Sequence, residues 1–265
     1  MRGRLIIQVR EIMAGHSKWA NIKRQKARVD AKKGKTFTQL SRAIIVAARN
    51  GGPDPEANFQ LRTAIEKAKA ASIPNDNIDR AIAKGAGTDD SNEAQLESIR
   101  YEGYGPCGVA VLIEALTDNR NRTAADLRSA FSKNGGNLGE TGCVSWMFEQ
   151  KGVVILEGEI NEEELLEISA EAGAESYEMN NDPSAEVFTE VTNLEALNRA
   201  LTEANFPVKE AELRWLANNY IEVTDADQAR SLLKLMDALE SLDDVQNVTA
   251  NFDMAEELMF ESSRL

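Results

Sequence analysis

The spacing of hydrophobic residues changes near residue 90, and this change constrains the fold more than any other feature of the sequence. Before it, apolar residues recur three and four positions apart in three short segments, each closed by glycine or proline, which predicts three short amphipathic helices. After it, strand-like segments alternate with segments of helical spacing. We therefore predict an α+β fold, with a small helical domain at the N-terminus and two α+β domains of ferredoxin-like (split βαβ) type, one inserted in the other.

Composition and charge indicate where the domains meet. The stretch "GTDDSNEAQ" is polar and helix-breaking, and the sign of the charge changes there. The strand-like "VQNVTANF" near the C-terminus is expected to pair back with strands near residue 100. The predicted parts are an extension or mis-chosen start at residues 1–12, a basic helical domain at 13–90, a discontinuous α+β domain at 91–148 and 214–265, and an inserted acidic α+β domain at 149–213.

Three local patterns make specific predictions. Thr36 followed by Gln39 fits a capping box and predicts that a helix starts there. The stretch "CVSWMF" (143–148) is typical of a strand. The stretch "GYGPCG" (103–108) has the glycine spacing of a dinucleotide site, but proline and a strand follow it instead of a helix, so it predicts a hairpin turn.

The charge of the chain is divided unevenly along its length. The 265 residues carry a formal net charge of −14. Residues 1–90 hold 18 Lys and Arg against 9 Asp and Glu, which makes them +9, whereas residues 91–265 are −23. Between Met13 and Asn50 there are ten cations and one acid. A polyanion is expected to be attracted to the basic N-terminal part and repelled by the acidic remainder.

This basic N-terminal stretch is the first candidate binding site. Clustered cations bind phosphate backbones through counterion release, and a tryptophan among them can stack on an unpaired base. The alternatives are a solvated charged face with a core tryptophan, a site for an acidic protein, or an anionic membrane surface; the cations face no clean apolar helix stripe, which disfavours the membrane. The residues predicted here to bind nucleic acid are Lys18, Trp19, Lys23, Arg24, Lys26, Arg28, Lys32, Lys33, Lys35 and Arg42.

A second candidate lies where a predicted strand ends and a helix begins, in "TDNRNRT" (117–123). Asn119, Arg120, Asn121 and Arg122 combine a helix N-terminus with two guanidinium groups, an arrangement suited to phosphate. The alternative is an ordinary capped turn with solvated arginines. The glycine-rich "NGGNLGETG" (134–142) can approach a ligand closely, but glycines this dense are also what turns require.

The sequence contains no positive sign of catalysis. His16 is the only histidine, so histidine-dependent triads and multi-histidine metal sites lack a second member. Cys107 and Cys143 form neither a C-x-x-C pair nor a disulfide framework, as is typical of thiols in a reducing cytoplasm. No apolar run approaches the length of a membrane helix. We predict a cytoplasmic protein that is not an enzyme, with no cofactor, no metal, no small-molecule substrate and no membrane partner.

Eight segments follow one another from Met13 almost to the C-terminus: "MAGHSKWANIK" (13–23), "DAKKGKTFTQL" (30–40), "SIPNDNIDRAIAKG" (72–85), "YEGYGP" (101–106), "ALTDNRNRTAADLR" (115–128), "GGNLGETG" (135–142), "VSWMF" (144–148) and "VQNVTANFD" (245–253). In these segments the chain resembles the YebC/PmpR family. The resemblance implies three domains, and it marks the basic N-terminal stretch, "TDNRNRT" and "GGNLG" as candidate contact regions. Members usually begin at the position of Met13, and small residues are expected where Cys107 and Cys143 stand.

The resemblance leaves the kind of nucleic acid open. Bacterial members are described as DNA-binding transcriptional regulators, and others act in translation at the ribosome, including a mitochondrial relative that activates translation of a cytochrome oxidase subunit. We therefore consider a DNA-binding transcriptional regulator first, a ribosome-associated translation factor that binds ribosomal RNA or tRNA second, and a protein–protein adaptor with a basic docking surface third. No recognisable major-groove module is present, which predicts weak or indirect base reading.

Overall fold

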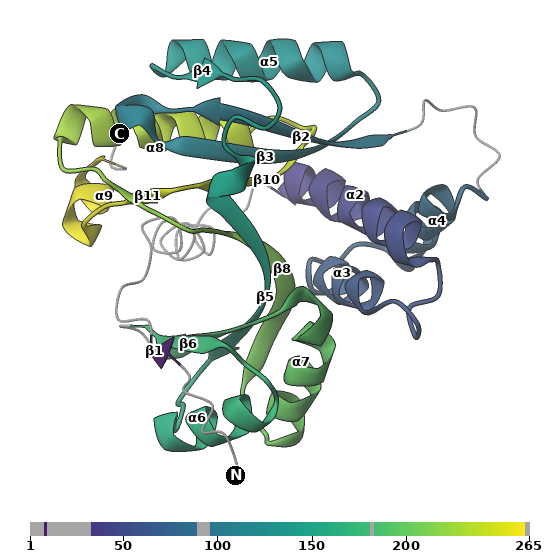
Figure 1. Cartoon of the computed structure of the whole chain (residues 1–265). Helices are drawn as coiled ribbons and strands as arrows, with labels where there is room; N and C mark the ends of the chain where they lie inside the picture. Colours follow the sequence, from purple (N-terminus) through teal and green to yellow (C-terminus); the bar gives the residue numbers. More distant parts are fainter. Residues whose placement is uncertain (1–7, 10–32, 89–95, 181–182, 263–265) are drawn as a thin grey trace. The chain divides into compact units, whose positions relative to one another are not determined.

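The computed structural model describes residues 8–9, 33–88, 96–180 and 183–262 (Figure 1). Contacts within the chain divide it into two units. The smaller unit comprises Met1–Met13 and Glu149–Leu216, and the larger comprises Ala14–Phe148 and Ala217–Leu265. A helical N-terminal part and two parts built around mainly antiparallel sheets confirm the predicted α+β class.

The N-terminal part of the larger unit is a bundle of three helices, α2 (Lys33–Gly51), α3 (Phe59–Ala70) and α4 (Asn75–Ala86). Their apolar stripes meet in a core that includes Ile44, Leu61 and Ala68, which are fully buried. The helix α2 begins at Lys33, so Thr36 lies inside the helix and the predicted capping box is wrong. Asn58 connects the end of α2 to the start of α3. Its side chain caps α3 and donates to the carbonyls of Ala47 and Gly52, both at 2.8 Å.

The sheet of the larger unit has the strand order β10-β3-β2-β4 and is antiparallel throughout. Its strands are β2 (Glu97–Tyr104), β3 (Ala110–Thr117), β4 (Asn137–Leu138) and β10 (Val245–Ala250). The predicted hairpin between β2 and β3 is confirmed and contains the short η1 (Pro106–Gly108). The C-terminal strand β10 does return to this sheet, but it pairs with β3 and not directly with β2.

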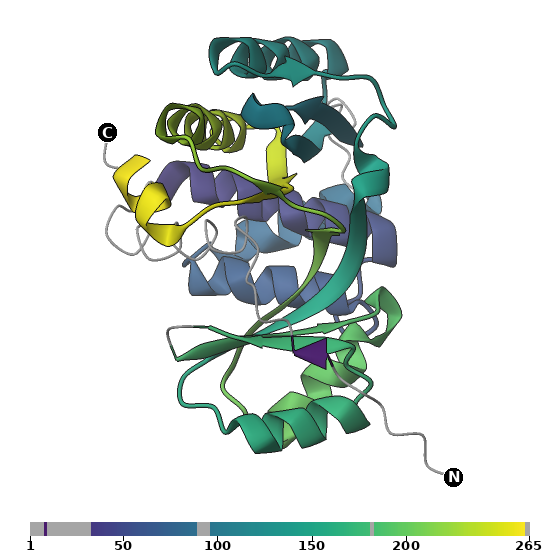
Figure 2. The same cartoon turned by 60° about the vertical axis from the view of Figure 1, so that its left-hand side comes forward.

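Two helices, α5 (Arg120–Lys133) and α8 (Ala226–Glu240), pack side by side against this sheet (Figure 2). The core between them contains alternate residues of β3 together with Leu127 and Phe131 of α5 and Leu232 of α8. Because alternate strand residues face the same side of a sheet, β3 presents Val111 and Ile113 to this core. The unit ends with a two-stranded parallel pair, β9 (Ile221–Glu222) and β11 (Phe252–Asp253), and the helix α9 (Glu256–Ser262).

The stretch "CVSWMF" is not a strand over most of its length. It forms the 3₁₀ turn η2 (Ser145–Met147), and β5 begins only at Phe148. A tertiary contact, which strand propensity cannot predict, explains why this stretch is not a strand. The carboxylate of Glu102 accepts the backbone N–H groups of Val144 and Ser145, which removes these donors from any strand ladder.

The smaller unit is a five-stranded sheet of order β1-β6-β7-β5-β8 with the helices α6 and α7 on one face (Figure 1). Asn161 caps α6 by accepting from the N–H groups of Glu163 and Glu164. The edge strand β1 pairs in parallel with β6. The elements of this unit are β1 (Gln8–Val9), β5 (Phe148–Glu157), α6 (Glu162–Glu171), β6 (Ser176–Met179), β7 (Ser184–Thr189), η3 (Val191–Asn193), α7 (Leu194–Glu203) and β8 (Val208–Ala217).

Candidate nucleic-acid interface

Most of the predicted basic cluster lies outside the described residues. This applies to Lys18, Trp19, Lys23, Arg24, Lys26, Arg28 and Lys32. Lys33 and Lys35 belong to the first turn of α2, and only their backbone is described. The predicted site residues whose side chains the structure places are Arg42, Asn119, Arg120, Asn121 and Arg122.

A single buried carboxylate, that of Asp244, gathers several of the polar side chains of the larger unit. Asp244 is 6% exposed and lies between α8 and β10. It accepts hydrogen bonds from the hydroxyl groups of Thr117 (3.1 Å) and Thr123 (2.7 Å), and from Nη2 of Arg122 (2.9 Å) and Nη1 of Arg42 (3.1 Å). Burial alone raises the pKa of Asp244, but these donors outweigh it and hold the pKa below its ordinary value. The carboxylate therefore stays ionised and connects α2, β3 and α5.

Arg42 reaches from α2 to this carboxylate with one of its three guanidinium nitrogens. Its Nη1 donates to Asp244, to the carbonyl of Asp243 and, more weakly at 3.4 Å, to the carbonyl of Leu116. Its Nε and Nη2 have no acceptor among the residues that the structure describes. The arginine is thus oriented at one nitrogen and retains donors at the other two.

The residues of "TDNRNRT" take different roles around the start of α5. Asn119 caps the helix, because its side chain accepts the N–H of Arg122 at 3.1 Å. Arg122 binds Asp118 at 2.7 Å as well as Asp244, and Arg120 pairs with Glu97 at 2.9 Å on the surface. Asn121 is exposed. Both arginines therefore hold ion pairs with carboxylates of the chain itself, so a phosphate at this helix end has to compete with these carboxylates.

The glycine-rich loop is organised by Glu102, a strand residue that is 3% exposed. Its carboxylate accepts the N–H groups of Gly142 (2.8 Å), Val144 (2.7 Å) and Ser145 (2.8 Å). Burial acts to raise the pKa of Glu102, but these backbone donors outweigh it and the pKa lies below its ordinary value. The three N–H groups that an outside anion would use are already occupied by a carboxylate of the chain.

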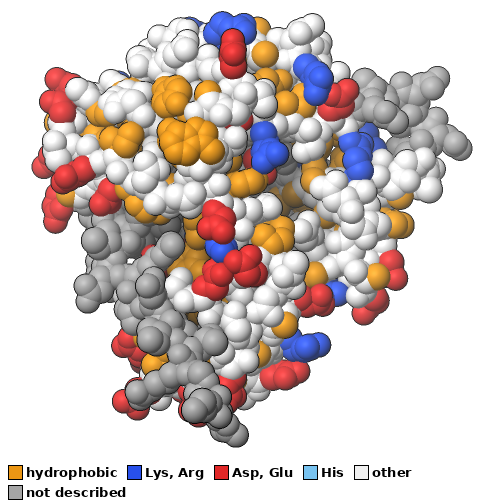
Figure 3. Space-filling model, in the orientation of Figure 1, with side chains coloured by type: hydrophobic (Ala, Val, Ile, Leu, Met, Phe, Trp, Pro, Cys, Tyr) orange, Lys and Arg blue, Asp and Glu red, His pale blue; other side chains and the backbone are white. Residues whose placement is uncertain are grey.

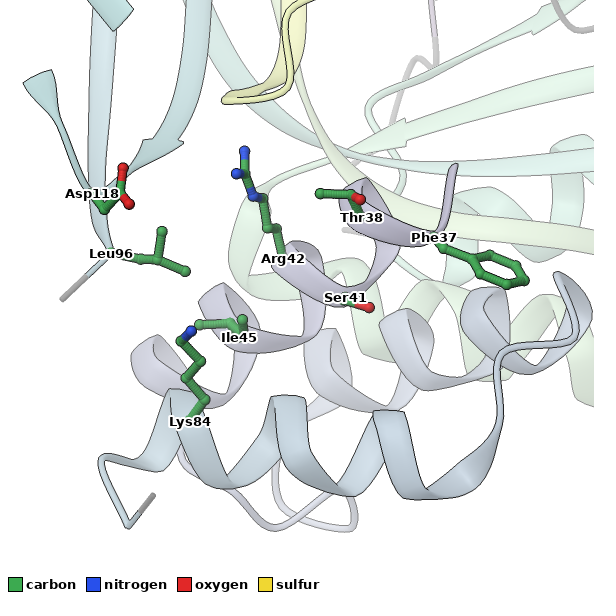
Figure 4. A pocket seen from close by; sticks show the side chains of 8 residues that line it. All are labelled: Phe37, Thr38, Ser41, Arg42, Ile45, Lys84, Leu96 and Asp118. Carbon is green, nitrogen blue, oxygen red and sulfur yellow. The ribbon is translucent and has the colours of Figure 1, made fainter. Parts of the chain in front are cut away.

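A groove of about 580 Å³ opens beside Arg42, between α2, α4 and the residues that flank β2 and β3 (Figure 4). Arg42 extends from α2 between Asp118 and Thr38, and Lys84 points from α4 towards Ile45 (Figure 4). Eight side chains line the groove: Phe37, Thr38, Ser41, Arg42, Ile45, Lys84, Leu96 and Asp118. Sequence patterns did not reveal this groove, because only Arg42 among these residues belongs to a charge cluster.

Acidic and basic side chains are distributed differently on the surface. On the face shown in Figure 3, acidic side chains form groups, and Lys and Arg side chains are scattered singly among them. Within the described part of the chain, no set of three or more His, Cys, Asp or Glu side chains is placed to hold a metal ion. No described helix combines the length and apolar character that a membrane span requires.

The fold and this site define an α+β protein with a helical N-terminal part and two sheet-containing parts, in which Arg42 and Lys84 line a groove together with polar and apolar side chains. Profiles of two parts of one protein family match most of the chain. The TACO1/YebC protein N-terminal domain matches residues 17–88, and the TACO1/YebC second and third domain matches residues 96–252. The chain therefore belongs to the TACO1/YebC family, which confirms the resemblance seen in the sequence.

Several relatives are similar over nearly their whole length. A probable transcriptional regulatory protein of Gloeothece citriformis is 80% identical over 250 residues, covering 93% of this chain and 98% of the relative. Another, from Nostoc punctiforme, is 76% identical over 247 residues with the same coverage of both chains. The crystal structure of a conserved hypothetical protein from Aquifex aeolicus is 46% identical, with a TM-score of 0.78 over 86% of this chain and 93% of that one.

Proposed function

We propose that this chain is a non-catalytic, nucleic-acid-binding regulator of gene expression, with duplex DNA as its target. The observation that carries the proposal is the separation of charge. Ten cations and one acid lie between Met13 and Asn50, a range that includes most of α2, whereas residues 91–265 are −23. The relatives named as probable transcriptional regulatory proteins support a role in transcription.

The mechanism follows from electrostatics. The cations of the N-terminal stretch would bind backbone phosphates and release condensed counterions, which supplies affinity without sequence specificity. The acidic remainder would be repelled by the same polyanion, so the protein would approach with its basic part foremost. Specificity would then depend on DNA shape or on a protein partner rather than on base contacts. We assign it to the cytoplasm, with no cofactor.

A binding titration tests the proposal. Wild-type protein is titrated against a duplex DNA, a structured RNA of equal charge and isolated ribosomes, each at about 50 and 200 mM salt. If about six phosphates are neutralised, affinity for the duplex should fall roughly a thousandfold between the two salt concentrations. The triple variant Lys23→Glu, Arg24→Glu, Lys26→Glu should lose binding.

A matched control changes the charge equally at another place. Arg128, Lys133 and Lys234 are exposed cations of α5 and α8, and their triple change to glutamate should leave binding nearly intact. An affinity that does not depend on salt, or equal losses in both triple variants, would contradict the proposal. If the protein co-sediments with ribosomes and added DNA does not displace it, the regulated process is translation and not transcription.

A further inference from the structure

We propose that the groove beside Arg42 binds one backbone phosphate of the nucleic acid, with Arg42, Lys84, Thr38 and Ser41 as its ligands. This inference rests on the proposed function and adds to it a specific site within the described residues. The groove is lined by two cations and two hydroxyl groups contributed by α2 and α4. Guanidinium, ammonium and hydroxyl groups are the side chains that most often donate to phosphate oxygens.

Arg42 is already oriented for this task. Its side chain is 18% exposed and is held at Nη1 by Asp244, so little conformational entropy remains to be lost when a ligand binds. Its Nε and Nη2, which lack acceptors among the described residues, are donors in a fixed plane. A planar pair of N–H donors matches two oxygens of a phosphate, which a lysine at the same position does not.

The two hydroxyl groups lie on the same helix as Arg42. Thr38 is three positions before Ser41 and four before Arg42, so its side chain neighbours both of them on the surface of α2. Figure 4 shows these side chains with Arg42 projecting from the helix between Thr38 and Asp118. The first turn of the same helix contains Lys33 and Lys35, which connects the groove to the basic stretch along one continuous element.

The acid that lines the groove is already compensated. Asp118 accepts from Nη2 of Arg122 at 2.7 Å, so its charge is offset from outside the groove. Arg42 is itself paired with Asp244 at 3.1 Å, so an incoming anion is met by Nε and Nη2, the two guanidinium nitrogens that this pair does not use. The apolar lining, formed by Phe37, Ile45 and Leu96, offers a surface for the sugar next to the phosphate. The volume of about 580 Å³ is in the range of ligand sites and exceeds that of a lone phosphate.

The test places a negative charge in the groove and the same charge elsewhere. Ser41 is half-buried on α2 and lines the groove, whereas Ser129 is exposed on α5. Ser41→Glu should weaken binding of a fluorescent 20-base-pair duplex by about tenfold or more, because like charges brought together oppose association. Ser129→Glu has the same net charge and should bind within about twofold of wild type. Thermal unfolding of both variants verifies that each is folded.

A second pair of variants removes a cation without adding an acid. Lys84→Gln should weaken duplex binding by about three- to tenfold and reduce the slope of log affinity against log salt by about 0.9, as expected for one lost phosphate contact. Lys234→Gln, on the exposed side of α8, should change neither quantity. This pair decides the question if Ser41→Glu fails to fold.

The outcomes separate this site from the function on which it rests. Selective losses in Ser41→Glu and Lys84→Gln support a phosphate in the groove. If wild type binds nucleic acid with a steep salt dependence but all four variants bind equally well, the groove is not a phosphate site and the proposed function stands. If wild type binds neither DNA nor RNA, both proposals fail.

Discussion

Asp244 is the residue on which much of the polar order in the larger unit depends. Its two oxygens receive hydroxyl donors from Thr117 and Thr123 and guanidinium donors from Arg42 and Arg122. Each arginine is held by a single nitrogen, so the carboxylate orients the two side chains without using all their donors. A buried charge is tolerated here because four side chains donate hydrogen bonds to it.

Replacing this carboxylate by its neutral isostere should be costly. Asp244→Asn removes the charge and leaves arginine donors facing an amide, so we expect the free energy of unfolding to fall by about 1–3 kcal/mol. Asp243→Asn is the matched control, because the neighbouring side chain is exposed and surface changes of this kind usually stay within about 0.5 kcal/mol. Urea unfolding of both variants measures the difference. Equal stabilities would show that the network does not contribute to folding.

At the scale of elements, the helix α2 is the part that brings the site together. On one side it packs against α4, and on another it contacts β10 through Gln39, whose side chain donates to the carbonyl of Val245. The approach of α4 is close because Gly85 faces α2. A Cβ atom at Gly85 would lie 2.6 Å from the carbonyl oxygen of Ile45 and 2.7 Å from Cβ of Ala48. The absence of a side chain at this one position allows the two helices that line the groove to pack as they do.

Gly85→Ala should therefore destabilise the bundle, although alanine is the better helix former. Alanine gains about 1 kcal/mol of helix propensity, but a Cβ atom against backbone forces α4 away from α2, and such overpacking costs about 1–3 kcal/mol. We expect a lower melting temperature in thermal unfolding followed by circular dichroism. Asn77→Ala, at an exposed position of the same helix, should be neutral or stabilising. A stabilised Gly85→Ala variant would mean that the two helices separate easily.

At the scale of the whole molecule, charge has two separate consequences. The +9 of residues 1–90 and the −23 of residues 91–265 are the basis of the proposed attraction to a polyanion. The second consequence concerns stability: buried carboxylates determine how the free energy of unfolding responds to acid. The pKa values of Asp244 and Glu102 both lie below their ordinary values of 3.8 and 4.5. In acid the folded chain therefore binds fewer protons at these two groups than the unfolded chain.

It follows that these two groups stabilise the folded state above their ordinary pKa values and lose that contribution as the pH falls through the lowered ones. Stability should be high near neutral pH and decline from about pH 4.5 downwards. Urea unfolding at several pH values between about 3 and 7 measures the profile. The decline should be shallower in Asp244→Asn than in Asp243→Asn. Parallel profiles for these two variants would exclude Asp244 as a source of the acid sensitivity.

Features that depend on residues close together in the chain could be predicted from the amino-acid sequence. Three helices, the hairpin at residues 103–108 and the caps Asn119 and Asn161 follow from contacts within a few positions, and the charge division follows from composition. The family could also be recognised from the sequence, because the resemblance lies in short contiguous segments.

The other features depend on contacts between residues far apart in the chain, which form only when it folds. Arg42 and Asp244 are 202 positions apart, so no periodicity or motif signals that they meet. Glu102 turns residues 145–147 away from a strand across about 40 positions. The groove combines α2, α4 and the residues that flank the paired ends of β2 and β3. Interactions between near neighbours specify helices and turns. The hydrogen-bond donors to a buried carboxylate, in contrast, are the groups that tertiary packing brings next to it, so they are defined only in the folded chain.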